Sequence, residues 1–287
     1  MKKILMITLC ALMITGLSGC AVRNYSTYEN SGKYTAASSA ALSEQINEIE
    51  INWSSGSVKI ETYDGDAVKF SEVSSLDKQS DAIGEATENK TLKESLKMRY
   101  TVSDGKLIIQ FCRSGLRVRL SAVEDLKKGL SIYVPAGSSF KLIDAVLMSA
   151  DLYVNGVAAD AIKCVSMSSE SRFVDCKVDE IDVNTTSGNT TVNMKDVLKT
   201  MTYRTVSGDL TVDAEGIDAL NVSSMSADIT LNVKKADFTL SLTGLSASLE
   251  ANGINYEITK EKAYKFGDGT GTITVSGQSG KVSVNAK

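Results

Sequence analysis

The sequence predicts an all-β fold, a β-solenoid with coils of about 20 residues and an irregular N-terminal strand and hairpin region. Three observations lead to this prediction. A short polar motif recurs at a spacing near 20 residues, apolar and polar residues alternate between the motifs, and helical periodicity is almost absent after residue 97. A repeat of this length buries its apolar face only by stacking on its neighbours.

The N-terminus has the parts of a signal peptide. Lys2 and Lys3 precede an apolar run over residues 4–17, and the segment ends Leu17-Ser18-Gly19-Cys20. The run is shorter than the roughly 20 residues that a membrane-spanning helix needs. We therefore expect residues 1–19 to be a signal peptide that is removed.

The segment that ends at Cys20 resembles the lipobox of bacterial lipoproteins. That resemblance implies that Cys20 carries the lipid and holds the protein on the extracytoplasmic face of the cell membrane. The alternative is an ordinary signal peptide followed by a chance cysteine. Residues 21–45 are rich in Ser, Thr, Ala, Asn and Tyr and have no apolar period, so we expect Cys20 and a flexible linker over residues 20–45 and a folded domain over 46–287.

The irregular region begins the folded part. Val58, Ile60 and Thr62 alternate with charged residues, which predicts a half-buried strand. Residues 74–97 are charged and are expected to form a loop, and residues 98–112 are expected to form a hairpin around Asp104-Gly105. A strand over residues 129–134 ends at Pro135, the only proline.

The repeats are clearest over residues 130–251. Six motif segments are recognised, at 149–152, 170–173, 187–190, 207–210, 226–229 and 246–249. In this alignment the third position is held by residues such as Arg172, Asp209 and Asp228, and the fourth re-enters the core. Each period contains two short strands, for example residues 210–214 and 220–224.

These repeats, preceded by the segment Tyr133-Val134-Pro135-Ala136-Gly137-Ser138, resemble a bacterial adhesin-like domain family of unknown function. The resemblance covers roughly residues 46–284 and is strongest over 130–251. It implies an exported or membrane-attached protein with a repetitive β-surface. No catalytic residues are assigned in that family, so none is carried over.

Stacked carboxylates are the sharpest candidate for chemistry. Asp209 and Asp228 hold the same motif position one coil apart, so their carboxylates are expected about 5 Å from each other. Such a pair suits a retaining glycosidase or a Ca²⁺ ion. The alternative is that these residues are solvated corner residues, because turns favour Asp.

The composition narrows the functional classes. The chain has no histidine, which removes the usual catalytic triads, Cys-His pairs and His-based metal sites. We therefore expect no catalytic residue, no cofactor and no metal site. Without Lys2 and Lys3, 29 basic side chains stand against 35 acidic ones, so a nucleic-acid partner is not expected.

Two smaller features leave alternatives open. Cys164 and Cys176 could form a disulfide in an exported protein, or could be small buried apolar residues together with Cys112. The basic segment 113–128, which includes Arg117 and Lys128, could bind an anionic polymer or lipid headgroup, or could be a solvated loop that caps the solenoid.

The sequence thus favours a non-enzymatic, membrane-tethered lipoprotein that presents a repetitive β-surface to an envelope protein or polymer. A β-helix carbohydrate-active enzyme that uses Asp209 and Asp228 is the first alternative. A solute-binding lipoprotein of a transporter is the second, although such proteins usually alternate strands and helices in two lobes.

Overall fold

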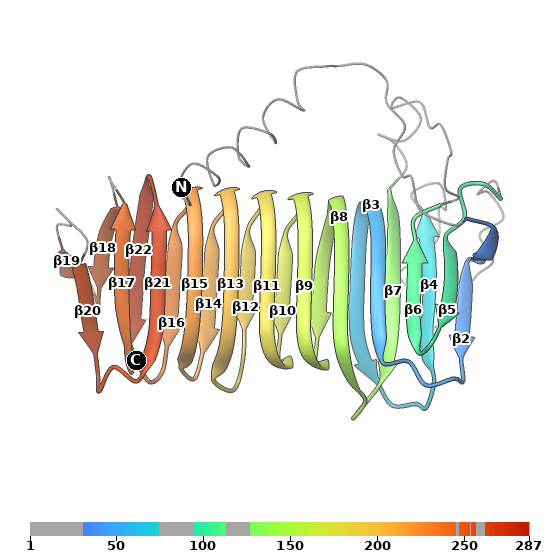
Figure 1. Cartoon of the computed structure of the whole chain (residues 1–287), viewed down its shortest axis with the longest axis horizontal. Helices are drawn as coiled ribbons and strands as arrows, with labels where there is room; N and C mark the ends of the chain where they lie inside the picture. The colour runs from blue at the N-terminus through green and yellow to red at the C-terminus, as the bar shows by residue number, and fades with distance from the viewer. Residues whose placement is uncertain are drawn as a thin grey trace, which may run out of the picture.

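The computed structural model describes residues 31–74, 94–112, 127–244, 247–252, 254–256 and 262–286. In this part of the chain the only helix is the 3-10 turn η1 (Ser31–Lys33), and the strands stack into one elongated, flattened solenoid (Figure 1). The strands are β1 (Thr35–Ala36), β2 (Ser39–Leu42), β3 (Glu48–Tyr63), β4 (Val68–Ser74), β5 (Arg99–Ser103), β6 (Lys106–Gln110), β7 (Lys128–Pro135), β8 (Ser139–Asn155), β9 (Ala158–Ser168), β10 (Ser171–Val174), β11 (Lys177–Ser187), β12 (Thr190–Asn193), β13 (Leu198–Ser207), β14 (Leu210–Ala214), β15 (Ile217–Ser226), β16 (Ile229–Val233), β17 (Phe238–Gly244), β18 (Ala247–Ala251), β19 (Ile254–Tyr256), β20 (Lys262–Phe266), β21 (Gly271–Gly277) and β22 (Gly280–Ala286).

The solenoid has two β walls with the core between them. Wall A runs in the order β1, β5, β6, the first half of β3, the first half of β8, β9, β11, β13, β15, β21, β17, β20. Wall B runs in the order β2, β4, β7, the second half of β3, the second half of β8, β10, β12, β14, β16, β22, β18, β19. The long strands β3 and β8 bend through both walls, so the two walls form one continuous sheet.

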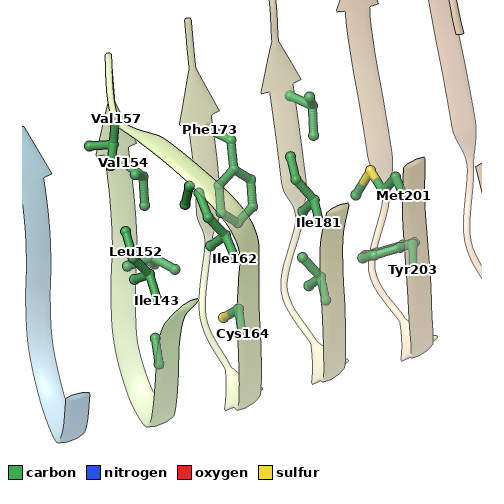
Figure 2. Packing of buried hydrophobic residues seen from close by; sticks show 14 of the residues in the cluster. Ile143, Leu152, Val154, Val157, Ile162, Cys164, Phe173, Ile181, Met201 and Tyr203 are labelled. Carbon is green, nitrogen blue, oxygen red and sulfur yellow. The ribbon is translucent and has the colours of Figure 1, made fainter. Parts of the chain in front are cut away.

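The core is built from equivalent residues of successive coils. Leu210 and Ile229 are direct partners in the parallel ladder, as the sequence predicts, and both are buried. Neighbouring Thr211 and Thr230 point outward and are partly exposed. Figure 2 shows the same arrangement on the opposite wall, where Ile162, Ile181 and Met201 project inward from successive strands of wall A.

Two corners where wall A turns into wall B require glycine, at Gly188 and Gly208. A Cβ on Gly208 would lie 2.3 Å from the carbonyl oxygen of Gly188, and a Cβ on Gly188 would lie 2.1 Å from that of Ser169. Gly188 also has φ 135°, a conformation that residues with a Cβ rarely adopt. The backbones of adjacent corners therefore pack directly on each other.

The predicted alignment of one repeat is wrong. Glu170, not Arg172, is equivalent to Asp151 and Asn189, because Ser171 pairs with Leu152 on one side and with Thr190 on the other. The re-entering residue of that coil is thus the hydroxyl residue Ser171, which a search for an apolar residue at this position misses.

The C-terminal coil is inserted out of sequence order. Strands β21 and β22 lie between the β15–β16 coil and the β17–β18 coil. Val282 therefore separates Ile229 from Leu249, although the order of the motifs along the sequence would place Leu249 directly after Ile229. Beyond them, β19 and β20 pair antiparallel with β18 and β17.

The N-terminal region is arranged in a similar way. Strand β3 lies between β8 and the β6–β7 coil, and β4 and β5 add to that coil antiparallel. The hairpin predicted over residues 98–112 is confirmed as β5 and β6, with Asp104 and Gly105 at positive φ in its turn. The expected loop over residues 74–97 lies mostly outside the described residues.

The predicted linker extends too far. Within residues 20–45, β1 pairs with β5 and β2 pairs with β4, and the Leu42 side chain is buried. Alternation in this stretch is short and built largely from alanine, so its apolar period is weak in the sequence. Cys20 lies outside the described residues. Among those described, no helix has the length and apolar character needed to cross a membrane.

Candidate interaction surface

The two candidate catalytic carboxylates, Asp209 and Asp228, lie in adjacent coils, as predicted. Each accepts a hydrogen bond from a backbone N–H of the next coil. Asp209 Oδ1 accepts a hydrogen bond from the Asp228 backbone N–H at 2.9 Å. Asp228 Oδ1 accepts one from the Lys281 N–H at 2.8 Å, and Asn189 Oδ1 accepts one from the Asp209 N–H at 3.0 Å. The Asp or Asn of each corner thus ties its coil to the next one.

This corner row is exposed, and a small pocket beside it is lined by Ala227, Gly280 and their neighbours but by neither Asp209 nor Asp228. The side chains of Asp209 and Asp228 are exposed, and each has one carboxylate oxygen bonded to a backbone N–H of the next coil. Within the described residues no group of His, Cys, Asp and Glu side chains is arranged to hold a metal ion. The geometry explains why the repeat carries Asp or Asn at this position.

The three cysteines that the structure describes form no disulfide with one another. Cys112 and Cys164 are buried and Cys176 is partly buried, with no disulfide between Cys164 and Cys176. The Cys164 sulfur lies 3.6 Å from the Ser171 hydroxyl, and the Cys176 thiol points at backbone carbonyls. Burial raises the pKa of both of these thiols to about 11.

The end of the basic segment is not a solvated surface. Residues 113–126 lie outside the described part, but Lys128 is fully buried. Its ammonium group contacts Glu72 Oε2 at 2.6 Å and donates to the carbonyl oxygens of Leu96 (2.9 Å) and Phe111. All three ammonium protons therefore have acceptors, and Lys128 is not available to bind an external anion.

The outer surface of wall B carries regular rows of polar side chains. One row holds the hydroxyl residues Thr191, Thr211, Thr230 and Ser283, which are partners in the parallel ladder. Two positions along each strand, a second row holds Asn193, Asp213, Asn232 and Asn285. We call these the hydroxyl row and the amide row.

Tyrosines lie at the N-terminal end of the same surface. Tyr133 and Tyr153 each stand between two buried residues of a strand and so project outward from wall B. Tyr133 packs edge-on against Tyr63, with ring centroids 6.2 Å apart. The repeat motifs do not single out these two tyrosines, although their place in alternating strands indicates outward-facing aromatic rings.

Wall A presents a different outer surface. Arg204 and Asp182 form an ion pair at 2.7 Å, as do Lys106 and Glu50. Several large apolar side chains are also exposed on its strands near the corner, and these are Val146, Val165, Met167, Val206 and Met225.

Comparison with known proteins gives a family assignment. Residues 46–285 match the Toastrack DUF4097 family. Among solved structures, a candidate cell adhesion protein from Clostridium sporogenes ATCC 15579 is 12% identical, with a TM-score of 0.39 over 87% of this chain and 99% of the other. A candidate adhesin from Bacteroides fragilis NCTC 9343 is 10% identical, with a TM-score of 0.41 over 86% of this chain and 95% of the other. No curated protein matches the chain.

Proposed function

This chain belongs to the Toastrack DUF4097 family, and from that premise we propose that it is a non-enzymatic cell-envelope lipoprotein. Its lipid at Cys20 holds it on the extracytoplasmic face of the cell membrane. Its solenoid presents a repetitive β-surface to another envelope protein or to a polymer. It needs no cofactor and does not bind nucleic acid.

One observation carries this proposal. The polar residues that the repeats share are either tied to the backbone at the corners or aligned in rows on an open wall. One carboxylate oxygen of Asp209, the best candidate for catalysis, accepts a hydrogen bond from the Asp228 backbone N–H. The hydroxyl and amide rows instead offer an extended surface, which is the usual binding feature of stacked repeat proteins.

The anchor is tested at Cys20. The Cys20→Ser protein should be released from membranes or remain unprocessed, because a lipid needs the Cys20 thiol for its attachment. Membrane fractionation with a high-salt wash, followed by mass spectrometry of the N-terminal peptide, measures this. A Cys20→Ser protein that is cleaved and still remains with the washed membrane contradicts the lipid anchor.

The absence of catalysis is tested at the corner row. We expect the Asp209→Asn, Asp228→Asn double variant to fold and to keep the binding of the wild type, because Asn also offers an oxygen acceptor to the next backbone N–H. Loss of a wild-type polysaccharide turnover in this variant, with its fold intact, would support the glycosidase alternative instead. Over the described residues the strands do not alternate with helices, as they usually do in two-lobed solute-binding lipoproteins.

A further inference from the structure

We propose that the outer surface of wall B binds an extended, uncharged polysaccharide that lies along the solenoid axis, across the strands. This inference rests on the proposed function and names the class of polymer that the surface fits. It is carried by the spacing of the rows, the hydrogen-bonding groups they offer, the tyrosines at one end, and the distribution of charge.

The spacing of the rows suits a chain of sugars. Thr191, Thr211 and Thr230 are direct ladder partners, so they repeat at the strand spacing of about 4.8 Å. This spacing is close to the length of one pyranose unit in an extended glycan. Each of these coils therefore offers a Thr or Ser from the hydroxyl row and an Asn or Asp from the amide row to successive sugars.

The hydroxyl row is free to bind. The hydroxyl groups of Thr191, Thr211 and Thr230 make no side-chain hydrogen bond with the described residues of the chain. A hydroxyl both donates and accepts hydrogen bonds, and an amide does the same. Within the amide row, Asn285 Nδ2 donates to Asn232 Oδ1 at 2.8 Å, which fixes the orientation of both side chains. Sugar hydroxyls present the complementary mixture of donors and acceptors.

Aromatic rings continue this surface toward the N-terminal end. Tyr153 leads through Arg172 into the hydroxyl row, because the two residues and Thr191 are successive ladder partners. Tyr133 lies on β7, on the far side of β3 from Tyr153. A tyrosine presents an apolar ring face together with a polar hydroxyl. Sugar rings have the same two characters, with C–H groups on their faces and hydroxyls at their edges.

The negative charge on this surface favours an uncharged glycan over an anionic one. The corner row beside the hydroxyl row holds Asp151, Glu170, Asp209 and Asp228, all exposed, and the amide row includes Asp213. These carboxylates repel a polyanion such as a phosphate-rich wall polymer. Over β12, β14, β16 and β22 the two rows contain no basic side chain that would offset this repulsion. Toward the tyrosines the hydroxyl row continues through Arg172 and Tyr153 to Lys59, whose ammonium group lies 5.8 Å from the Tyr153 ring centroid.

The binding test uses the full chain in mild detergent and defined probes. In affinity electrophoresis we expect retardation by hydroxyethyl cellulose and none by polygalacturonate, which is anionic. With soluble probes, we expect affinity for cello-oligosaccharides to increase with chain length, because a longer chain contacts more coils. Failure of the wild type to bind any neutral glycan probe, including chito-oligosaccharides and maltodextrin, overturns the proposal.

Matched variants assign the binding to wall B. Thr211→Lys with Thr230→Lys changes two adjacent coils on wall B, and Thr202→Lys with Asn221→Lys changes the same two coils on wall A. We expect the wall B pair to lower glycan affinity at least tenfold and the wall A pair to leave it unchanged. Equal losses in the two pairs overturn the proposal.

The tyrosines give a second test. Tyr133→Ala with Tyr153→Ala should lower affinity at least tenfold, and the corresponding Phe variants should keep most of it because the ring faces remain. If an envelope protein is captured by the wild type and lost with the wall B lysines while no glycan binds, the glycan inference fails and the proposed function stands.

Discussion

At the scale of single residues, the most consequential interaction is the buried pair of Lys128 and Glu72. Both side chains are fully buried, and the Lys128 ammonium group also lies 4.2 Å from the Phe111 ring centroid and 4.9 Å from that of Trp53. Burial lowers the pKa of Lys128 and raises that of Glu72, since both charges lose water. Glu72 also accepts from the Met98 N–H at 2.9 Å, so the pair joins several segments of the N-terminal end.

Removing only the cation should be costly. Lys128→Met leaves the Glu72 carboxylate buried without its partner, and we expect the free energy of unfolding to fall by about 3–5 kcal/mol at pH 7. Urea denaturation measures this change. Adding Glu72→Gln removes the unpaired charge and retains an acceptor for Met98, so the double variant should recover most of the loss. A loss below about 1 kcal/mol in the single variant would show that the pair is not buried in solution.

The same variant has a predicted pH dependence. Without Lys128, the pKa of Glu72 rises further, so the folded state takes up a proton at a pH where the unfolded chain stays ionised. The stability deficit of Lys128→Met should therefore shrink as pH falls from 7 toward the ordinary range of a glutamate. Denaturation of both proteins at pH 7 and pH 5 tests the sign, and a deficit that grows on acidification contradicts it.

The thiols provide another residue-scale prediction. The pKa of Cys176 is raised to about 11 by burial, so about one thiol in a thousand is ionised at pH 8. In a protein whose other cysteines are replaced by Ala, we expect slow modification by a disulfide reagent and a rate that rises about tenfold per pH unit up to pH 10. The same protein in urea should react at once. Rapid reaction of the folded protein at pH 8 would contradict the burial of this thiol.

At the scale of the strand and the coil, the sequence predicts which side chains face the core, but it does not always predict which residues are partners in the ladder. Alternation identifies β14 correctly, because Leu210 and Val212 are buried and Thr211 is not. Alternation also holds at β10, but the alignment of the repeat motif fails there, because the residue that re-enters the core is Ser171, next to Cys164. A core that includes hydroxyl residues hides the apolar signal that motif matching needs. The spacing of the motif places Asp209 and Asp228 in adjacent coils, as the structure has them. The hydrogen bonds of their carboxylates to the next coil depend on the distance and direction of its backbone N–H groups, which the spacing does not give.

The stacked coil is tested within one strand. Leu210→Asp places a carboxylate between Thr190 and Ile229 in the core, so we expect a loss of more than about 3 kcal/mol in the free energy of unfolding. Thr211→Asp on the outer surface should change it by no more than about 0.5 kcal/mol. Chemical denaturation followed by circular dichroism compares the two, and equal tolerance of both variants rejects the inward assignment of Leu210.

At the scale of the whole molecule, spatial order departs from chain order at both ends. Strand β3 stacks between β8 and the β6–β7 coil. The β21–β22 coil stacks between the β15–β16 coil and the β17–β18 coil. The repeat period could not predict this, because any strand with the right alternation can extend a parallel ladder. In each insertion, a strand or coil from near one end of the described chain takes a place in the middle of a parallel ladder. Antiparallel strands, β4 and β5 at one end and β19 and β20 at the other, pair with the outer coils. Such strands protect edges that would otherwise pair with other chains.

The inserted C-terminal coil should hold its end of the solenoid together. Deleting residues 269–287 removes β21 and β22, which are the ladder partners of β15 and β17 in wall A and of β16 and β18 in wall B. We expect β17 and β18 to lose protection in hydrogen exchange, and β9 to β14 to retain it, because each coil of a solenoid depends chiefly on its nearest neighbours. Deleting residues 31–34, which precede β1, is the matched control and should leave β17 and β18 protected. If these strands stay protected after the C-terminal deletion, they can stack directly on β15 and β16, and the inserted coil is not what holds them.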